Sequence, residues 1–240
     1  MLMKIALIGY GKMGHMIEDI AVDRGHEIVL RLNIDNLEDF TQHNISKANV
    51  AIEFTGPDSA YENVKQCIQF GIPVVSGSTG WNNKIADIQE LCLERGGSFL
   101  HTSNFSIGVN IFFALNRQLA KLMASHPEYE VSMREIHHTE KKDAPSGTAV
   151  TLAEQVLAEL PRKQRWVNQP ARSGEELSII SERIDPAAGR HDVKYSSEID
   201  ELEIVHTAHN RKGFALGAVL AAEYIHDKKG VFQMKDVLGI

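Results

Sequence analysis

The stretch Lys4-Ile5-Ala6-Leu7-Ile8-Gly9-Tyr10-Gly11-Lys12-Met13-Gly14 decides the fold of this chain. Its first five residues form a compact apolar run, which is typical of a parallel strand buried on both faces. The next six have the pattern G-x-G-x-x-G, and the residues from Lys12 to Arg24 carry apolar side chains at helical spacing. A glycine-rich turn between a strand and a helix is where this pattern binds a dinucleotide pyrophosphate. We therefore predict a cofactor loop made of Gly9, Tyr10, Gly11, Lys12, Met13 and Gly14.

The same alternation of strand and helix continues through the first hundred residues. Further strands are expected at Glu27 to Asn33, Asn49 to Phe54, Ile72 to Ser76 and Ser98 to His101, and helices at Ser59 to Phe70 and Trp81 to Arg95. This alternation predicts a parallel sheet with helices on both faces. In that context dinucleotide binding is favoured over the alternative, an ordinary strand-to-helix turn.

After about residue 105 the pattern changes to that of an α+β domain with a mainly antiparallel sheet. Helices are expected in it at Val109 to Ala124 and Gly147 to Leu160, and strands at Tyr129 to His138, Leu177 to Ile184, His191 to Ser197 and Leu202 to Ala208. Between them, Pro161 to Gly174 is polar and basic and is expected to be a surface loop. A further helix is expected after this domain, at Gly213 to Ile225. The ending from Val231 to Leu238 is amphipathic.

Composition excludes several classes of function. The net charge is −7 and no long basic run is present, so we expect no nucleic-acid partner. There is no run of eighteen apolar residues and no signal-peptide pattern, so we expect no membrane span or secretion. The two cysteines, Cys67 and Cys92, are interpreted as free core thiols, which favours a cytoplasmic location.

Two further segments are candidates for the cofactor site. Gly77-Ser78-Thr79-Gly80 falls at the carboxyl end of an expected parallel strand, where open α/β sheets bind ligands, although a plain turn would look the same. Thr102-Ser103-Asn104-Phe105 follows the next strand and is either a hinge or part of the nicotinamide pocket. Asn33 stands where an acidic residue would bind ribose hydroxyls. Because it is neutral, the choice between NAD and NADP stays open.

The segment E135-I-H-H-T-E-K-K-D-A-P-S-G-T-A149 carries the chemistry of the second half. His137 and His138 supply groups that titrate near neutral pH, Lys141 supplies a cation, and a helix N-terminus after Pro145 would cradle a carboxylate. Neighbouring strand residues point to opposite faces, so the two histidines share a direction only if the strand ends there. Two partly exposed polar residues would be the ordinary interpretation, but Lys141 and the following turn favour a site that protonates an anionic small molecule. No metal site is expected, since no third ligand has convincing spacing. His191 and His206 are expected to be structural.

On these motifs the chain resembles the 4-hydroxy-tetrahydrodipicolinate reductase (dihydrodipicolinate reductase) family. The likeness runs through essentially the whole chain and is carried by G9-Y-G-K-M-G14, G77-S-T-G80, N104-F-S-I-G-V-N110, the long segment E135 to A149, G189-R-H191 and F232-Q-M-K-D-V-L238. The resemblance implies a Rossmann-type nucleotide domain at residues 1–104, completed by 213–240. It also implies a substrate-binding domain at 105–212 that assembles a homotetramer through its sheet.

The resemblance further implies NADH- or NADPH-dependent reduction of a small dicarboxylate, 4-hydroxy-tetrahydrodipicolinate, to tetrahydrodipicolinate in diaminopimelate and lysine biosynthesis. His137 and Lys141 match the proton-transfer pair, with the immediate proton source left open between them. The matching substrate contacts are His138, Gly147 and Thr148, and the matching cofactor segments are Gly9 to Gly14, Gly77, Ser78, Thr79, Thr102, Ser103, Asn104 and Phe105. Two alternatives remain: a related dehydrogenase acting on an amino-acid-derived imine or aldehyde, and a nucleotide-binding regulator without turnover.

Overall fold

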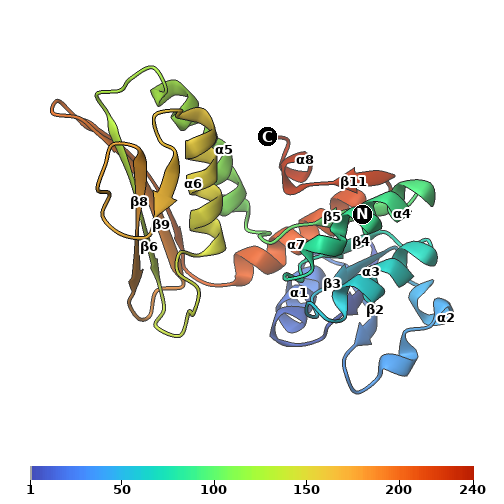
Figure 1. Ribbon diagram of the computed structural model, residues 1–240. Coiled ribbons are helices and arrows are strands. Elements are labelled where there is room, and N and C mark those ends of the chain that lie inside the picture. Colours follow the sequence, from blue (N-terminus) through green and yellow to red (C-terminus); the bar gives the residue numbers. More distant parts are fainter. Residues whose placement is uncertain (1) are drawn as a thin grey trace. The chain divides into compact units, whose positions relative to one another are not determined.

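The computed structural model describes residues 2–240 of the chain, which divides into two compact units (Figure 1). The first comprises Met1–Ile107 and Lys212–Ile240, and the second comprises Gly108–Arg211. These divisions fall within a few residues of the expected boundaries at 104/105 and 212/213. The first unit is therefore built from both ends of the chain, while the second is a single continuous segment.

A six-stranded sheet forms the centre of the first unit, in the order β11-β5-β4-β3-β1-β2. Every neighbouring pair in it is parallel. The central strands are buried along almost their whole length, as strands covered on both faces must be. Their bounds are β1 Lys4–Ile8, β2 Glu27–Leu32, β3 Val50–Glu53, β4 Val74–Ser76, β5 Ser98–His101 and β11 Gly230–Phe232.

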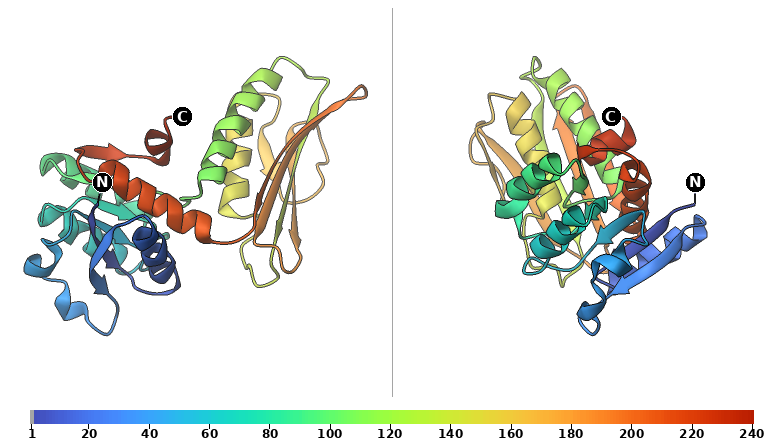
Figure 2. Two further views of the ribbon diagram at one scale, coloured as in Figure 1. Left: turned by 180° about the vertical axis from the view of Figure 1, so that it is seen from behind. Right: turned by 90° about the vertical axis from the view of Figure 1, so that its right-hand side faces the viewer.

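Helices cover both faces of this sheet and create two hydrophobic cores (Figure 2). One core joins the sheet to α1 (Lys12–Asp23), α7 (Lys212–Ile225) and α8 (Met234–Leu238). The other joins it to α3 (Ala60–Gln69) and α4 (Ile85–Glu94). The sequence did not predict the short elements η1 (Leu37–Asp39), α2 (Gln42–Ile45) and η2 (Asn82–Lys84).

The C-terminal segment completes the first unit at two places. Strand β11 pairs in parallel with β5, and α7 packs so closely on the chain after β5 that a Cβ on Gly217 would lie 1.8 Å from the carbonyl oxygen of Phe105. The amphipathic ending expected from Val231 to Leu238 is thus a short strand followed by a short helix.

The second unit has a five-stranded sheet in the order β10-β9-β6-β8-β7, with two helices packed on one face (Figures 1 and 2). Pairings β10–β9 and β9–β6 are antiparallel, whereas β6–β8 and β8–β7 are parallel, so the sheet is mixed. The bounds are α5 Ile107–Met123, β6 Glu130–His137, α6 Gly147–Glu159, β7 Arg165–Val167, β8 Glu176–Arg183, β9 Gly189–Ser196 and β10 Glu201–Ala208.

The expectation that Pro161 to Gly174 is a surface loop is corrected by the structure, because this segment contains the edge strand β7. The ammonium group of Lys163 is buried, where it donates to the carbonyl oxygen of Glu176 at 2.9 Å and pairs with Glu130. Arg165 also binds the Glu176 carboxylate at 2.6 Å. These contacts hold the segment against β8 despite its polar composition.

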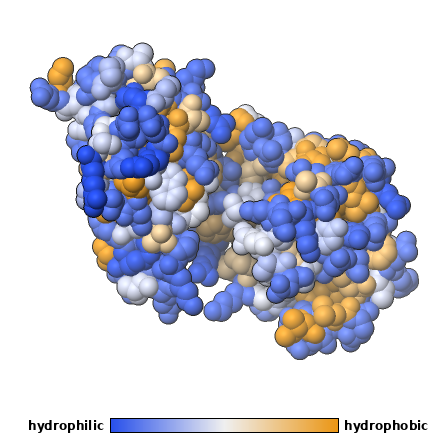
Figure 3. All heavy atoms as spheres, in the orientation of Figure 1, coloured by the Kyte–Doolittle hydropathy of each residue, from blue (hydrophilic) through white to orange (hydrophobic). Residues whose placement is uncertain are grey.

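The surface drawn in Figure 3 is mainly hydrophilic, with apolar residues gathered in small separate patches. Within residues 2–240, none of the helices has both the length and the apolar character needed to cross a bilayer.

The close approach of α7 to the chain after β5 gives a stability prediction. Gly217→Ala should lower the free energy of unfolding by about 2–3 kcal/mol, because the added methyl overlaps the Phe105 carbonyl and helix or loop must shift. Gly213→Ala is the matched control on the same helix, since its nearest outside neighbour would be the Ser106 hydroxyl at 3.7 Å. Chemical denaturation of both variants is the measurement. Equal effects in the two variants would contradict the close contact between α7 and Phe105.

Candidate active site

The glycine loop packs tightly against its neighbours at two of its three glycines. Gly9 has a φ of +97°, and a Cβ there would lie 2.2 Å from the carbonyl oxygen of Phe54. A Cβ on Gly14 would lie 2.6 Å from the carbonyl oxygen of Gly9. Gly11, the N-cap of α1, has nothing within 4 Å of its Cβ position. The first and third glycines thus allow tight packing, while the second leaves its side of the loop open to a ligand.

A cavity of about 410 Å³ lies beside this loop at the ends of β1, β2 and β3. Its walls combine apolar side chains with a few polar ones, as nucleoside sites do. Asn33 directly follows β2 and lines this cavity, and its side-chain oxygen accepts the N–H of Ile34 at 2.8 Å. Among residues 2–240, none of the side chains that line it is basic. Arg31, on β2, is held instead by Glu18 of α1.

A second cavity, of about 440 Å³, lies on the other side of the loop. Its walls include Lys12 and Met13, the chain after β3 and the segment Gly77-Ser78-Thr79 after β4. The fully buried carboxylate of Glu53 ties the last two together, accepting the N–H of Thr55 at 2.8 Å and the hydroxyl of Ser78 at 2.6 Å. The two cavities and the open face at Gly11 fit a dinucleotide, with Lys12 the cation available to its phosphates.

The segment from Thr102 to Phe105 extends the same edge of the sheet. The Thr102 N–H donates to the carbonyl oxygen of Ser76 at 3.3 Å, and its hydroxyl accepts the N–H of Asn104 at 3.1 Å. Ser103 is exposed. Phe105 is buried in the core with its ring 5.6 Å from that of Phe54, so it supports the cavity walls from behind.

In the second unit, β6 ends at His137, which is the condition set for the His-His pair. Alternation along the strand places Glu135 and His137 on the same buried face. His191 on β9 is the register partner of Glu135 and lies on that face too. The Nδ1 atom of His137 is 3.4 Å from Glu135 Oε2, and the Nε2 atom of His191 is 3.6 Å from the same oxygen. His138 follows the strand and is only half-buried.

Burial and charge set the protonation of this group. Burial alone would raise the pKa of Glu135, but hydrogen bonds from His191 and Ser146 outweigh it and hold that pKa well below its usual range. Burial lowers the pKa of His137 to about 4, with Glu135 opposing the shift. In the free protein at neutral pH, Glu135 is therefore ionised and His137 is neutral.

The chain after β6 brings the remaining predicted residues to the same end of the unit. Lys141 Nζ pairs with the carboxylate of Asp143 at 2.8 Å. Ser146 caps α6, its hydroxyl accepting the N–H of Ala149 at 3.2 Å, so Gly147 and Thr148 open the helix. Anions are stabilised at such a helix start.

Three side chains of this cluster are near enough to share a metal ion, with ligand atoms of Glu135, His137 and His191 all within 4.8 Å of one another. The Glu135 carboxylate, however, already accepts the N–H of Ser146 at 3.0 Å and pairs with the Arg183 guanidinium at 3.3 Å. A metal would compete with both donors. The donor set therefore fits an ion-pair network.

Sequence reasoning missed two members of this cluster and left a third without a role. The sequence predicts a structural role for His191 and gives no signal for Arg183. Both reach Glu135 from strands whose pairing with β6 is set by the fold. Glu135 was quoted in the motif without a role, although its i, i+2 spacing from His137 already indicated a shared face.

The first unit has a parallel sheet with a glycine-rich loop and two cavities along its carboxyl edge, and the second unit carries a histidine–lysine cluster. These features are those of a nicotinamide-nucleotide-dependent oxidoreductase. Sequence profiles described as "Dihydrodipicolinate reductase, N-terminus" and "Dihydrodipicolinate reductase, C-terminus" match residues 3–105 and 108–238. The chain belongs to the dihydrodipicolinate reductase family, as its motifs predicted.

Individual relatives agree with this assignment. The chain is 46% identical over 238 residues to a 4-hydroxy-tetrahydrodipicolinate reductase of Christiangramia forsetii, covering 98% of both chains. It is 36% identical over 213 residues to that of Methanosarcina barkeri, covering 87% of this chain and 79% of the relative. A solved dipicolinate-bound dihydrodipicolinate reductase from Paenisporosarcina sp. TG-14 shares the fold, with a TM-score of 0.78 and 22% identity. The match covers 97% of this chain and 98% of that structure. The predicted α/β fold class is confirmed.

Proposed function

We propose that this protein is a cytoplasmic enzyme that reduces 4-hydroxy-tetrahydrodipicolinate to tetrahydrodipicolinate with NADH or NADPH, as part of diaminopimelate and lysine biosynthesis. The observation that carries the proposal is the buried, neutral His137 beside Lys141 and the start of α6, in a chain that also has a glycine-rich nucleotide loop. In the overall reaction, hydride and a proton are added and the hydroxyl leaves as water, with NAD⁺ or NADP⁺ formed.

The residues of the second unit would bind the dicarboxylate and manage the proton. Lys141, His138 and the first backbone groups of α6, at Gly147 and Thr148, would hold the two carboxylates. The arriving negative charges would raise the pKa of His137 from about 4, so substrate itself would favour the protonated imidazole. A positioned donor of this kind contributes about 10²–10⁴-fold in rate. The nicotinamide supplies the hydride when it is bound.

The direct test is oxidation of NADH or NADPH by the purified protein, with and without substrate freshly generated by dihydrodipicolinate synthase. Oxidation that requires the synthase product supports the proposal. Oxidation with other amino-acid-derived imines or aldehydes alone would indicate a related dehydrogenase. Cofactor binding without turnover on any of them would indicate a regulator.

Cofactor use is predicted to be dual. Asn33 can hydrogen-bond a ribose hydroxyl without repelling a 2′-phosphate, and the described residues that line its cavity include no basic one to attract such a phosphate. Steady-state kinetics with both nucleotides should differ in kcat/KM by less than about 10²-fold, or roughly 2.7 kcal/mol. Asn33→Asp should shift the preference toward NADH. A larger preference in the wild-type protein would refute dual use.

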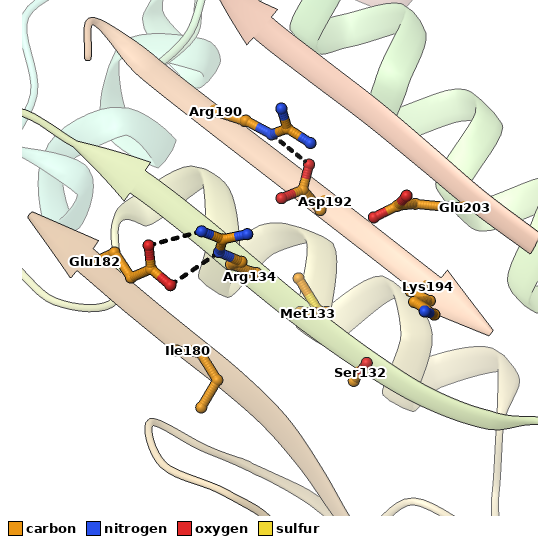
Figure 4. Close-up of a pocket in the computed structure, with 9 residues that line it drawn as sticks. All are labelled: Ser132, Met133, Arg134, Ile180, Glu182, Arg190, Asp192, Lys194 and Glu203. Carbon is orange, nitrogen blue, oxygen red and sulfur yellow. Dashed lines mark hydrogen bonds and ion pairs between the residues drawn. The ribbon is translucent and has the colours of Figure 1, made fainter. Parts of the chain in front are cut away.

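We also propose a homotetramer assembled through the sheet of the second unit. The face of this sheet opposite α5 and α6 carries both signs of charge, with the pairs Arg134–Glu182 and Arg190–Asp192 each at 2.8 Å (Figure 4). Such a mixed face can pair with its own copy across a two-fold axis. Sedimentation at micromolar protein should give a tetramer. Arg134→Glu places a carboxylate opposite Glu182 on this face, and we expect the like charges to weaken the homotetramer. A wild-type monomer would exclude it.

Variants of the two proposed proton-transfer residues should behave differently. Lys141→Ala should lower kcat strongly and also raise KM for the dicarboxylate, because it removes a charge that binds substrate. His137→Gln should act mostly on kcat, because it removes a proton donor more than a charge. NADH binding to the free protein should hardly change in either. Near-normal turnover by a folded variant would rule out the role of that residue. Loss of cofactor binding in Lys141→Ala would show that the Lys141 segment binds the cofactor and not the dicarboxylate.

A further inference from the structure

We propose that Glu135 is the positioning residue of the proton-transfer site, holding His137, the Lys141 loop and the start of α6 in one arrangement through Arg183, His191 and Ser146. The inference rests on the proposed function, since it gives Glu135 a role in the same reaction. Glu135 itself would touch neither substrate nor cofactor.

The first support is the set of partners around the Glu135 carboxylate. The residue is fully buried, and a buried carboxylate is costly unless it is paired and hydrogen-bonded. Oε1 accepts the N–H of Ser146 at 3.0 Å and lies 3.3 Å from the Arg183 guanidinium. Oε2 lies 3.4 Å from His137 and 3.6 Å from His191. Its partners thus come from β6, β8, β9 and the cap of α6.

Arg183 extends this arrangement to the lysine. Its Nε donates to the carbonyl oxygen of Lys141 at 3.3 Å, and its Nη2 donates to that of Asp143 at 2.5 Å as well as to Glu135. Lys141 in turn pairs with the Asp143 side chain. One guanidinium therefore fixes the backbone on both sides of the Lys141–Asp143 turn relative to the buried carboxylate. A lysine at position 183 would keep the charge without this fork.

Ser146 and His191 extend the arrangement to the helix. The Ser146 hydroxyl caps Ala149 and lies 3.1 Å from His191 Nε2, while its N–H is bound by Glu135. The position at which α6 begins, and with it the proposed carboxylate cradle, is thus set by the same carboxylate. On the other side of the His137 ring, a Cβ on Gly189 would lie 3.2 Å from Nε2, so the ring is packed between Glu135 and the backbone of β9.

Charge supplies a consequence that packing alone would not. The titratable and charged groups acting on His137 are Glu135 from its own strand, Arg183 from β8, His191 from β9 and Lys141 from the following loop. Glu135 is the negative one and raises the pKa of His137, whereas the other three lower it. Neutralising Glu135 should therefore lower the pKa of His137, both in the free protein and with substrate bound.

The test is Glu135→Gln, which keeps the size of the side chain and removes its charge. We expect kcat to fall by roughly 10²-fold, a loss that a misplacement of about 1 Å can cause. The high-pH limb of the kcat profile, which reports loss of the protonated donor in the substrate complex, should also move to lower pH. NADH affinity should not change. Glu130→Gln is the matched control, since it removes a carboxylate–lysine pair from the same strand at its far end.

Arg183→Lys separates geometry from charge. It should leave the limb near its wild-type position but raise KM for the dicarboxylate several-fold, because the Lys141 turn loses its fork. If Glu135→Gln does not fold, this variant decides alone, and a wild-type KM overturns the inference. If Glu135→Gln folds and keeps wild-type kcat and limb, the inference is also overturned.

These outcomes are distinct from failure of the proposed function. If His137→Gln keeps full turnover, the proton-transfer assignment itself is wrong. If His137→Gln is inactive while Glu135→Gln is normal, only the positioning role of Glu135 is wrong.

Discussion

Burial of the Glu135 charge is the constraint on which the site of the second unit depends. A carboxylate in this position needs donors on every side, and they come from strands that are far apart in the sequence. The register of β6 against β8 and β9 is therefore as important to the chemistry as to the sheet. A slip of one residue would turn Glu135 and His137 to the opposite face, where the mixed charges of Arg134 and its neighbours now lie.

The first unit could be predicted well because its central strands are short runs of almost wholly buried residues that alternate with amphipathic helices. Apolar runs such as Lys4–Ile8 and Val50–Glu53, separated by amphipathic helices, indicate parallel strands without knowledge of their neighbours. The strands β7 and β11 are as short as β4, but they are only partly buried where β4 is fully buried, so no apolar run marks them and pairing with a neighbouring strand creates them. The parallel pairing of β8 with β6 follows from the intervening helix α6, which the sequence did predict, although the run of strands after it favoured mainly antiparallel pairing.

Some residues of the candidate site could likewise be predicted from the sequence, and others could not. The glycine loop and the segment from Glu135 to Ala149 are continuous in sequence, so their residue types alone predicted a nucleotide site and a proton-transfer site. Arg183 and His191 carry no such local signal, because an arginine and a histidine at strand ends are usually surface residues. What gives them a role is the burial of Glu135 and the pairing of three strands, neither of which can be read from periodicity.

Because the first unit is built from both ends of the chain, the two units become complete at different times during synthesis. The second unit, Gly108–Arg211, is complete when its last residue leaves the ribosome, whereas β5 and the face covered by α7 must wait for the final segment. Until then the nascent chain exposes an unpaired strand edge and an apolar sheet face, both of which favour aggregation. The nucleotide-binding half is thus begun first and finished last. A ribosome that stops short of Lys212 releases a chain that has its glycine loop but not the helix that covers the sheet beside it.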